Sequence, residues 1–453
     1  MVHEHWWYKL IKVCRRWRYL ILGSVSHLSL CLVCSSGALV EEMLAHFPSF
    51  PLIIFRHDKN HDLTPEDERG IMFALKHRDR VRRIYLSMPV PSLEKVIKTL
   101  EDQFPVLESL YILPVTMHDA HLVLPATFSA PQLSYLTLNH FAFPTGSPSP
   151  TTAVSLVRLS LRWVYPSINL YPNHLLQTLS LLPQLQDFSI TFSSPVLSRD
   201  IERHMLHMPN ISYTTHPSLR SLVFGGTSAY FEALLSHMNL PLLGTLGVTF
   251  FNQLNFFVPH LRQFVTTTEN LKSSSVTLLF YHRGASMFMY PPVIPLSPTL
   301  DIRVGCDHLD WQVFSMTQIL SALGPIFSAV VDLTLDYRGH ILSSEWHNQA
   351  DSTHWRELLG LFRNVRILRV HNGLVGEFSR CLALDGEPAS WVLPELKILV
   401  CPMGSRDDKM FATLIHDREV AGLPIDHVEV AFPAGRVRYE FGTPTGIDYI
   451  PLP

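Results

Sequence analysis

The chain has 453 residues, of which 47% are apolar and 17% charged. Its 36 basic and 39 acidic residues give a net charge of -3, so no overall positive field would attract nucleic acid, and we expect no nucleic-acid partner. A charged fraction below the roughly 25% usual for soluble domains indicates a large core and a partly apolar surface, which favours partner binding.

Residues 9–21 are predicted to form a basic amphipathic helix. Lysines and arginines lie mostly off its apolar stripe, and the stripe is typical of a membrane-surface helix, the start of a signal sequence, or a docking helix. The apolar run that follows, 19–34, is diluted by serines and is too short to cross a bilayer, so we expect no membrane association. The stripe consists of Leu10, Val13, Cys14, Trp17, Leu20 and Ile21.

The six cysteines are too few for a disulfide framework in so long a chain, which indicates a reducing compartment, cytoplasmic or nuclear. Cys31 and Cys34 have C-x-x-C spacing, but the next cysteine is Cys306, so the second half of a zinc site is absent. Leucines alternate through residues 28–32, and this pattern favours a strand. We therefore expect neither a metal nor a cofactor.

The spacing leucine-x-x-leucine-x-leucine, with apolar substitutions, recurs ten times. Such alternation predicts half-buried strands, and a repeated strand that cannot bury its apolar side alone must stack on its neighbours. Successive copies start 26, 26, 23, 29, 34, 24, 87, 35 and 31 residues apart. The copies start at Val81, Leu107, Leu133, Leu156, Leu185, Leu219, Leu243, Val330, Val365 and Leu396.

The 87-residue gap equals three periods of 29, and two weaker strands are predicted inside it, at 276–280 and 300–304. Helical patterns with apolar residues three and four apart separate other strands, at 91–100, 230–235 and 355–362. Alternating strands and helices predict an α/β fold with a parallel sheet on one face and helices on the other. An ordinary α/β domain whose buried strands happen to look alike is the alternative.

A proline precedes six of the copies by two residues. Proline cannot continue a preceding helix and favours extended backbone before it, so it marks the start of each strand. The six are Pro105, Pro131, Pro183, Pro217, Pro241 and Pro394.

This pattern resembles an irregular leucine-rich repeat solenoid. The regular family places Asn or Cys three residues after the last leucine of the strand, and that ladder is missing here, so the turns must be closed in another way. The resemblance implies a curved parallel sheet with helices on its outer face over 25–441, a short helix within 1–24 before it, and a tail at 442–453. The ladder positions hold Val115, Phe141, Val164, Ser193, Thr227 and Phe251.

The segment Val13-Cys14-Arg15-Arg16-Trp17 is similar to the second half of an F-box, and the chain after it resembles fungal F-box proteins with degenerate leucine-rich repeats. The resemblance implies a substrate receptor of a cullin-based ubiquitin ligase. In that family the F-box binds a Skp-type adaptor, which joins the cullin scaffold, and the repeats bind the protein substrate. The candidate adaptor-binding residues, which match apolar positions of the motif, are Leu10, Val13, Cys14 and Trp17.

The chain departs from the family at its start. A complete F-box opens with a leucine-proline helix start and a first helix, and only residues 1–8 stand in their place. We therefore expect either that adaptor docking is impaired or that the remaining helix only caps the first repeat, since the end of a solenoid must be shielded from water. A stand-alone interaction scaffold and a secreted or membrane-associated repeat protein are the alternatives.

No catalytic motif is present: the sequence has no G-x-S-x-G, no Walker loop and no H-E-x-x-H. His57 and His61 are four residues apart, but their polar neighbours indicate a loop before a helix that starts at Thr64. The acidic residues 66–68 fit the first turn of that helix, and the charged run 76–80 fits its solvated end. We expect a protein that is not an enzyme.

Overall fold

The structure is a computed structural model in which part of the chain is described. The described residues are 6–24, 30–34, 40–47, 49–56, 63–115, 122–142, 153–164, 170–193, 213–251, 256–291, 298–338, 352–370, 374, 392–402, 415–416, 418–420 and 422–431. The predicted tail at 442–453, His57 and His61 all lie outside these residues.

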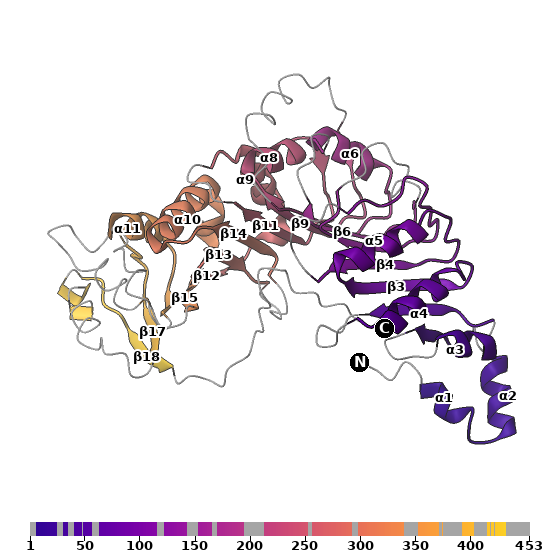
Figure 1. Ribbon diagram of the computed structural model, residues 1–453. Coiled ribbons are helices and arrows are strands. Elements are labelled where there is room, and N and C mark those ends of the chain that lie inside the picture. The colour runs from indigo at the N-terminus through magenta and orange to yellow at the C-terminus, as the bar shows by residue number, and fades with distance from the viewer. Residues whose placement is uncertain are drawn as a thin grey trace.

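One sheet of sixteen strands runs the length of the described chain. Figure 1 shows that the sheet curves into an arc, with the strands along its inner, concave side and the helices along its outer side. All neighbouring strands are parallel except for the two pairings of β13. The fold is therefore the predicted irregular leucine-rich repeat solenoid, a mixed α/β structure.

The first nine strands of the sheet follow one another in chain order. They are β1 (Leu32–Cys34), β2 (Leu52–Arg56), β3 (Val81–Met88), β4 (Ser109–Pro114), β5 (Tyr135–Asn139), β6 (Arg158–Val164), β7 (Asp187–Phe192), β9 (Ser221–Gly226) and β11 (Thr245–Phe250). A separate pair of short parallel strands consists of β8 (Thr214–Thr215) and β10 (Met238–Asn239).

Helices cover the outer side of the sheet, and the three predicted helical patterns are confirmed as α5, α8 and α11. The α-helices are α1 (Trp6–Leu10), α2 (Arg15–Gly23), α3 (Val40–His46), α4 (Pro65–Leu75), α5 (Val90–Thr99), α6 (Pro172–Ser180), α8 (Ser228–Leu235), α9 (Pro259–Thr267), α10 (Leu309–Leu323) and α11 (Ser352–Gly360). Two 3-10 helices are η1 (Glu269–Leu271) and η2 (Gly324–Ala329).

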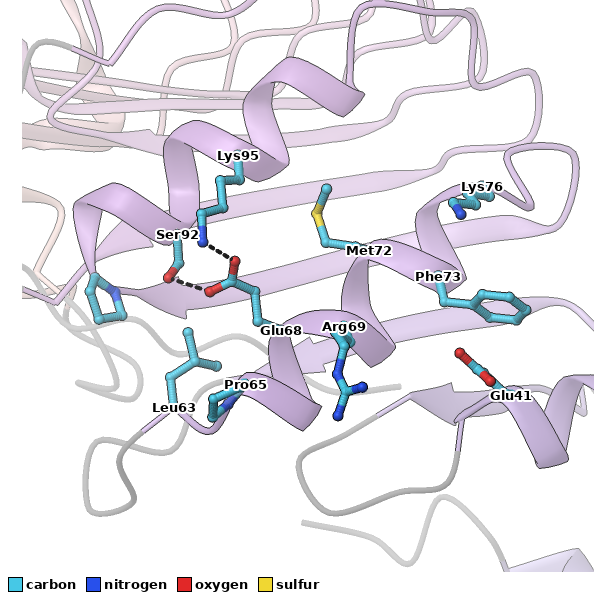
Figure 2. A pocket seen from close by; sticks show the side chains of 11 residues that line it. Glu41, Leu63, Pro65, Glu68, Arg69, Met72, Phe73, Lys76, Ser92 and Lys95 are labelled. Atoms are coloured by element: carbon cyan, nitrogen blue, oxygen red, sulfur yellow. Dashed lines mark hydrogen bonds and ion pairs between the residues drawn. The ribbon is translucent and has the colours of Figure 1, made fainter.

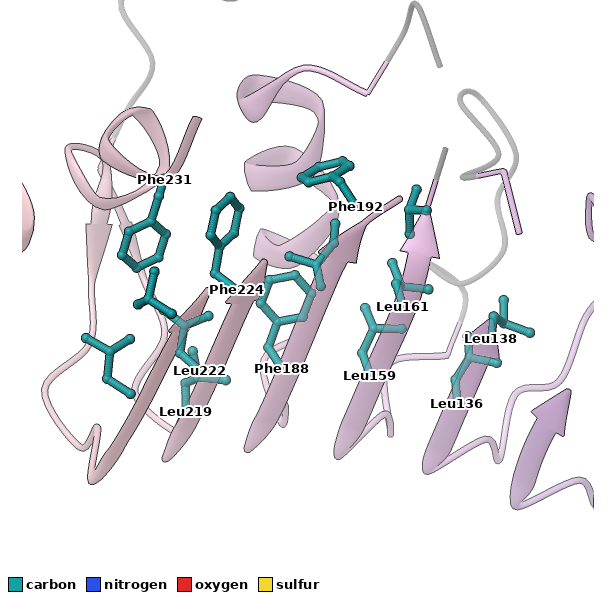
Figure 3. Packing of buried hydrophobic residues seen from close by; sticks show 14 of the residues in the cluster. Leu136, Leu138, Leu159, Leu161, Phe188, Phe192, Leu219, Leu222, Phe224 and Phe231 are labelled. Carbon is teal, nitrogen blue, oxygen red and sulfur yellow. The ribbon is translucent and has the colours of Figure 1, made fainter. Parts of the chain in front are cut away.

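The core consists of two apolar ladders on the helix side of the sheet. Because side chains alternate across a strand, the second and third leucines of each repeat point toward the helices and contact their counterparts in the next strand. Figure 3 shows the middle of both ladders. The first runs through Leu110, Leu136, Leu159, Phe188, Leu222 and Leu246, and the second through Ile112, Leu138, Leu161, Ile190, Phe224 and Val248, all of them buried.

All ten predicted repeats form strands of this sheet, and the structure shows how their turns close without an asparagine ladder. At Pro183, for example, a β-turn returns the Leu185 N–H to the Leu182 carbonyl at 3.2 Å, with proline at the position that such turns favour. The next two N–H groups, of Gln186 and Asp187, both bond to the Val157 carbonyl of the preceding repeat, at 2.8 and 3.1 Å. After the strands, at three of the ladder positions, the N–H groups of Val115, Ser193 and Phe251 also bond to carbonyls of the preceding repeat, at 3.0, 2.9 and 3.1 Å.

The long gap between repeats is a correction to the predicted three regular periods. Both predicted strands exist, as β12 (Ser275–Tyr281) and β14 (Leu300–Gly305), but β13 (Gly284–Met289) lies between them and is antiparallel to both. The order is also reversed, since β14 pairs with β11 and β12 pairs with β15. The last strands are β15 (Asp332–Arg338), β16 (Ile367–Val370), β17 (Ile398–Pro402) and β18 (His427–Ala431).

Candidate functional site

The N-terminal segment forms two short helices, so the predicted single helix over 9–21 is wrong. Residues 11–14 break it, and Cys14 has an extended backbone (φ -159°, ψ 168°) just before α2. Trp7, outside the predicted stripe, is buried with its ring 5.6 Å from Phe47 and 5.3 Å from Phe50. Because α1 thereby packs on the first repeat, it closes the end of the core as a cap does.

The four candidate adaptor-binding residues fall into two groups. Leu10 is partly buried and packs against the core. Val13 and Trp17 are 65% and 45% exposed, and Cys14 is exposed as well. Leu20, 60% exposed, extends this surface along α2, and we call Val13, Trp17 and Leu20 the α2 patch. The structure thus separates one residue with a core role from three that remain accessible.

The concave face of the sheet is formed by the variable positions of the repeat motif. On adjacent strands, Phe55, Tyr85 and Tyr111 are in register, with ring centroids 6.1 and 6.3 Å apart. A second row, one pleat away, aligns Ser109 with Tyr135 and continues into the next strands. The row is Arg83, Ser109, Tyr135, Arg158 and Asp187.

Two ion-pair groups lie in this second row. Asp187 accepts hydrogen bonds from Nε and a terminal nitrogen of Arg158, at 3.0 and 2.8 Å, and the guanidinium lies 5.9 Å from the centroid of the Tyr135 ring. Arg82 and Arg83 both approach the Glu108 carboxylate, each at 3.8 Å. We call this part of the concave side the arginine-tyrosine face, and define it as Arg83, Tyr85, Tyr111, Tyr135 and Arg158. It combines two guanidinium groups with three aromatic rings.

The C-terminal part of the concave face is different, because its charges are paired with one another. Asp301 accepts from Arg303 at 2.6 Å, with burial raising the pKa of the Asp301 carboxyl and the guanidinium opposing that shift. The other pairs are Asp336 with Arg338 at 3.2 Å and Asp332 with Arg369 at 3.1 Å.

An open groove of about 760 Å³ lies on the helix side, between α3, α4 and α5 (Figure 2). At its centre Glu68 accepts hydrogen bonds from Ser92 Oγ at 3.0 Å and Lys95 Nζ at 2.5 Å. The lysine holds the pKa of Glu68 below its ordinary value, so the carboxylate is ionised and serves to link α4 to α5. The groove is lined by Glu41, Leu63, Pro65, Glu68, Arg69, Met72, Phe73, Lys76, Pro89, Ser92 and Lys95.

The predicted helix start at Thr64 is confirmed. Thr64 Oγ1 accepts from the Asp67 N–H at 3.1 Å while the Asp67 carboxylate accepts from the Thr64 N–H at 3.3 Å, which is a capping box. The interpretation of 76–80 as a solvated end is wrong for Arg80, whose guanidinium donates to the Phe50 and Phe47 carbonyls at 2.9 and 2.8 Å. Arg80 therefore fastens the turn before β2.

Two of the described thiols, those of Cys34 and Cys306, are buried. Burial raises the pKa of Cys34 to about 11 and that of Cys306 to about 12, so both are neutral near pH 7. Cys34 belongs to β1 and Cys31 directly precedes it, which confirms the strand interpretation of this pair. Within the described ranges, no three His, Cys, Asp or Glu side chains are grouped so that they could bind a metal ion.

The sequence indicated Val13 and Trp17 of the α2 patch as candidate site residues, but it did not indicate the arginine-tyrosine face. Its residues occupy the positions between the leucines, so a signal existed: arginine and tyrosine recur at the outward positions of the first four copies. Alignment of these side chains depends on strand register, which repeat spacings of 23 to 29 residues do not give.

Comparison with known proteins adds little to what the structure shows. No family model matches the chain, and no curated protein matches it. Among solved structures it is similar to the leucine-rich repeat-containing protein LegL7 from Legionella pneumophila, with 14% identity, 72% of this chain and 94% of that chain covered, and a TM-score of 0.27. None of the described helices combines the length and apolar character needed to span a bilayer. The leucine-rich-repeat fold therefore rests on the strand order and the repeated turns of this chain.

Proposed function

We propose that this chain is a non-enzymatic protein-binding solenoid that serves as the substrate receptor of a Skp-cullin-F-box ubiquitin ligase, in the cytoplasm or nucleus. The observation that supports protein binding is the concave face, where the repeats place their variable residues while the helices lie on the other side (Figure 1). Repeat solenoids use such extended concave surfaces to bind partners.

The proposed role in a ubiquitin ligase is supported by the α2 patch. Capping of the solenoid requires Trp7, Ile11 and Ile21, which are buried, whereas Val13 and Trp17 are exposed. Exposed apolar residues grouped on a helix and in the turn just before it are typical of a docking surface. The adaptor would take up this patch, and the cullin scaffold would follow through the adaptor.

A stand-alone interaction scaffold is the second candidate. It is favoured by the packing of α1 on the first repeat, because a segment that is part of the solenoid's own core has a structural role without any adaptor. The two candidates share the concave binding face and differ only in the use of the α2 patch.

Co-purification of the full chain with a Skp-type adaptor separates the candidates. We expect the wild-type chain to retain the adaptor and Trp17→Ala to lose it, because truncation removes the largest apolar side chain of the α2 patch. Trp311→Ala is the matched control, since Trp311 is 51% exposed on α10, far along the chain. Failure of the wild-type chain to retain adaptor, or equal loss with both variants, would leave the scaffold alone.

Binding through the concave face has its own test. Partners captured from native cells by the wild-type chain are expected to be lost with Thr137→Glu, which places a charge on the concave side of β5. Leu181→Glu, at an exposed position after α6 on the helix side, serves as the control. Loss of the same partners with Leu181→Glu but not with Thr137→Glu would contradict concave binding.

A further inference from the structure

Charges are distributed unevenly between the two ends of the sheet. Strands β2 to β7 contain five arginines and one aspartate, whereas β14 to β16 contain three arginines and three aspartates. The three aspartates of the second group are each paired with one of its arginines. The first group therefore carries an excess of positive charge that the second does not. Its charged residues are Arg56, Arg82, Arg83, Arg158, Arg162 and Asp187.

The acidic groups near the arginine-tyrosine face satisfy only part of its donor capacity. Arg82 and Arg83 approach one carboxylate, that of Glu108, and both distances of 3.8 Å are longer than a hydrogen bond. Each guanidinium has five N–H donors arranged as a planar fork, which suits a second carboxylate. Arg158 uses Nε and one terminal nitrogen for a single Asp187 oxygen, and its other terminal nitrogen carries two further N–H donors.

The spacing of the two arginines suits an extended chain. Arg83 and Arg158 belong to one row, three strands apart, with Ser109 and Tyr135 between them. At ~4.8 Å per strand this separation is about 14 Å, which an extended peptide covers in about four residues. Tyr135 lies within that span, and its ring, 46% exposed, offers aromatic surface to the residues between.

We propose that the arginine-tyrosine face binds an extended acidic segment of a partner protein. Two carboxylates about four residues apart bond to Arg83 and Arg158, and the apolar residues between them pack on Tyr135. This inference rests on the proposed function, that the concave face binds protein, and names the chemistry of the partner. A nucleic acid fits less well, because these strands contain no lysine and the chain as a whole has a net charge of -3.

Fluorescence anisotropy of the full chain with a short labelled peptide tests this. The probe has two glutamates about four residues apart around proline and phenylalanine, and its counterpart has glutamines instead. We expect the glutamate peptide to bind and Arg83→Gln and Arg158→Gln each to weaken it about tenfold. Tyr135→Ala, at a residue 46% exposed, should weaken it severalfold. Arg262→Gln, at an exposed arginine of α9 on the helix side, should change it less than about twofold.

Three results would overturn the inference: equal binding of the glutamine peptide, unchanged affinity in both arginine variants, or tighter binding of a single-stranded RNA that the same variants weaken. Thermal melting of each variant verifies that folding is retained. Failure here is distinguishable from failure of the proposed function. If native partners are captured and Thr137→Glu releases them while the acidic peptide does not bind, the concave face binds protein of another chemistry.

Discussion

The stretch from β2 to β11 and the stretch from β11 to β15 solve the same packing problem with opposite chain paths. In the first stretch, the strands have the same order in the sheet as along the chain. In the second, the order in the sheet is β14, β13, β12, the reverse of their order along the chain. The first apolar ladder nevertheless continues without a break, from Leu246 through Leu300, Met289 and Val276 to Leu333. Continuity of the apolar ladder therefore depends on which side chains face the helices and not on whether neighbouring strands are parallel or antiparallel.

This difference predicts different cooperativity. In the sequential stretch a strand can separate with its own helix, as expected of a quasi-one-dimensional stack. In the reversed stretch, β12 pairs with β13, β13 pairs with β14, and β14 pairs with β11. Separation of β15 from β12 therefore affects a group of strands that extends to β11. We expect the reversed stretch to open as one unit.

The largest effect is expected from Phe280→Ala compared with Phe188→Ala. Both rings are buried, on β12 and β7, and either truncation should lower the free energy of unfolding by about 3–5 kcal/mol through a cavity. The Phe280 ring is also 5.3 Å from that of Trp355 on α11. Hydrogen exchange should therefore accelerate from β11 to β15 with Phe280→Ala, but only around β6, β7 and β9 with Phe188→Ala. Equal spreading in both variants would refute the distinction.

A smaller effect is expected where the chain leaves the sequential stretch. The Glu232 carboxylate accepts from the His260 and Leu261 N–H groups, at 2.7 and 2.9 Å, and so satisfies the start of α9. Glu232→Ala should lower the free energy of unfolding by about 1–3 kcal/mol, because two donors lose their partner. Glu94→Ala, at an exposed glutamate of α5, is the control for denaturant melts. A loss no larger than that of the control would contradict the capping role.

The same carboxylate should make stability depend on pH. Burial raises the pKa of Glu232 above its ordinary value of 4.5, and the two N–H groups offset only part of this. Since the folded state holds the proton more tightly, wild-type stability relative to Glu232→Gln is greatest below the ordinary pKa and decreases as pH rises through the raised pKa. Melting temperatures of both proteins from about pH 4 to pH 7 measure this difference. An opposite slope would show that the N–H groups dominate.

Thr64→Ala tests a local contact of the sequential stretch. Removing the hydroxyl that accepts from the Asp67 N–H should cost about 1 kcal/mol and increase exchange in α4 without reaching β12. Thr178→Ala, at a half-buried threonine inside α6 whose hydroxyl donates to the His174 carbonyl of its own helix, provides the comparison. Exchange that spread through the sheet would contradict the independence of these repeats.

The smallest effect is expected from Glu68→Gln, which removes the ion pair between α4 and α5. Lys95 is 60% exposed, so the loss should be about 0.5 kcal/mol. Because the lysine lowers the pKa of Glu68, this contribution is present above the ordinary pKa and disappears as pH falls through the lowered one. Urea melts of both proteins at neutral and acidic pH measure it, and a difference that persisted in acid would refute the ion-pair explanation.

Most of the sheet could be predicted because inward leucines alone define its strands. The ten copies of the motif are all strands, and the first leucine is buried beside the turn in each case where proline precedes it. β13 could not be found in this way, since all six of its residues are buried and its sequence does not alternate. β18 lies beyond the last copy of the motif and was missed, although Val428 and Val430 alternate with polar residues in it.

The candidate site was less predictable. The helical stripe correctly contained exposed residues such as Trp17, but it missed Trp7, whose burial against Phe47 and Phe50 decides which residues are left for docking. The arginine-tyrosine face arises from register between strands with unequal spacing along the chain. The alternation within each strand predicts that the side chains of Arg83 and Tyr135 point away from the helices. Only the pairing between strands places these side chains in one row.

The reversed strands also limit how such a protein can change length during evolution. Duplication or loss of a single unit is compatible with the sequential stretch, because each unit pairs with the unit before it through the same kind of parallel strand ladder. Between β11 and β15, deletion of β14 alone or β12 alone would bring the oppositely directed β13 beside β11 or β15. Lineages descended from this chain should therefore gain or lose β12, β13 and β14 as a block, together with the long helix α10 that returns the chain to β15.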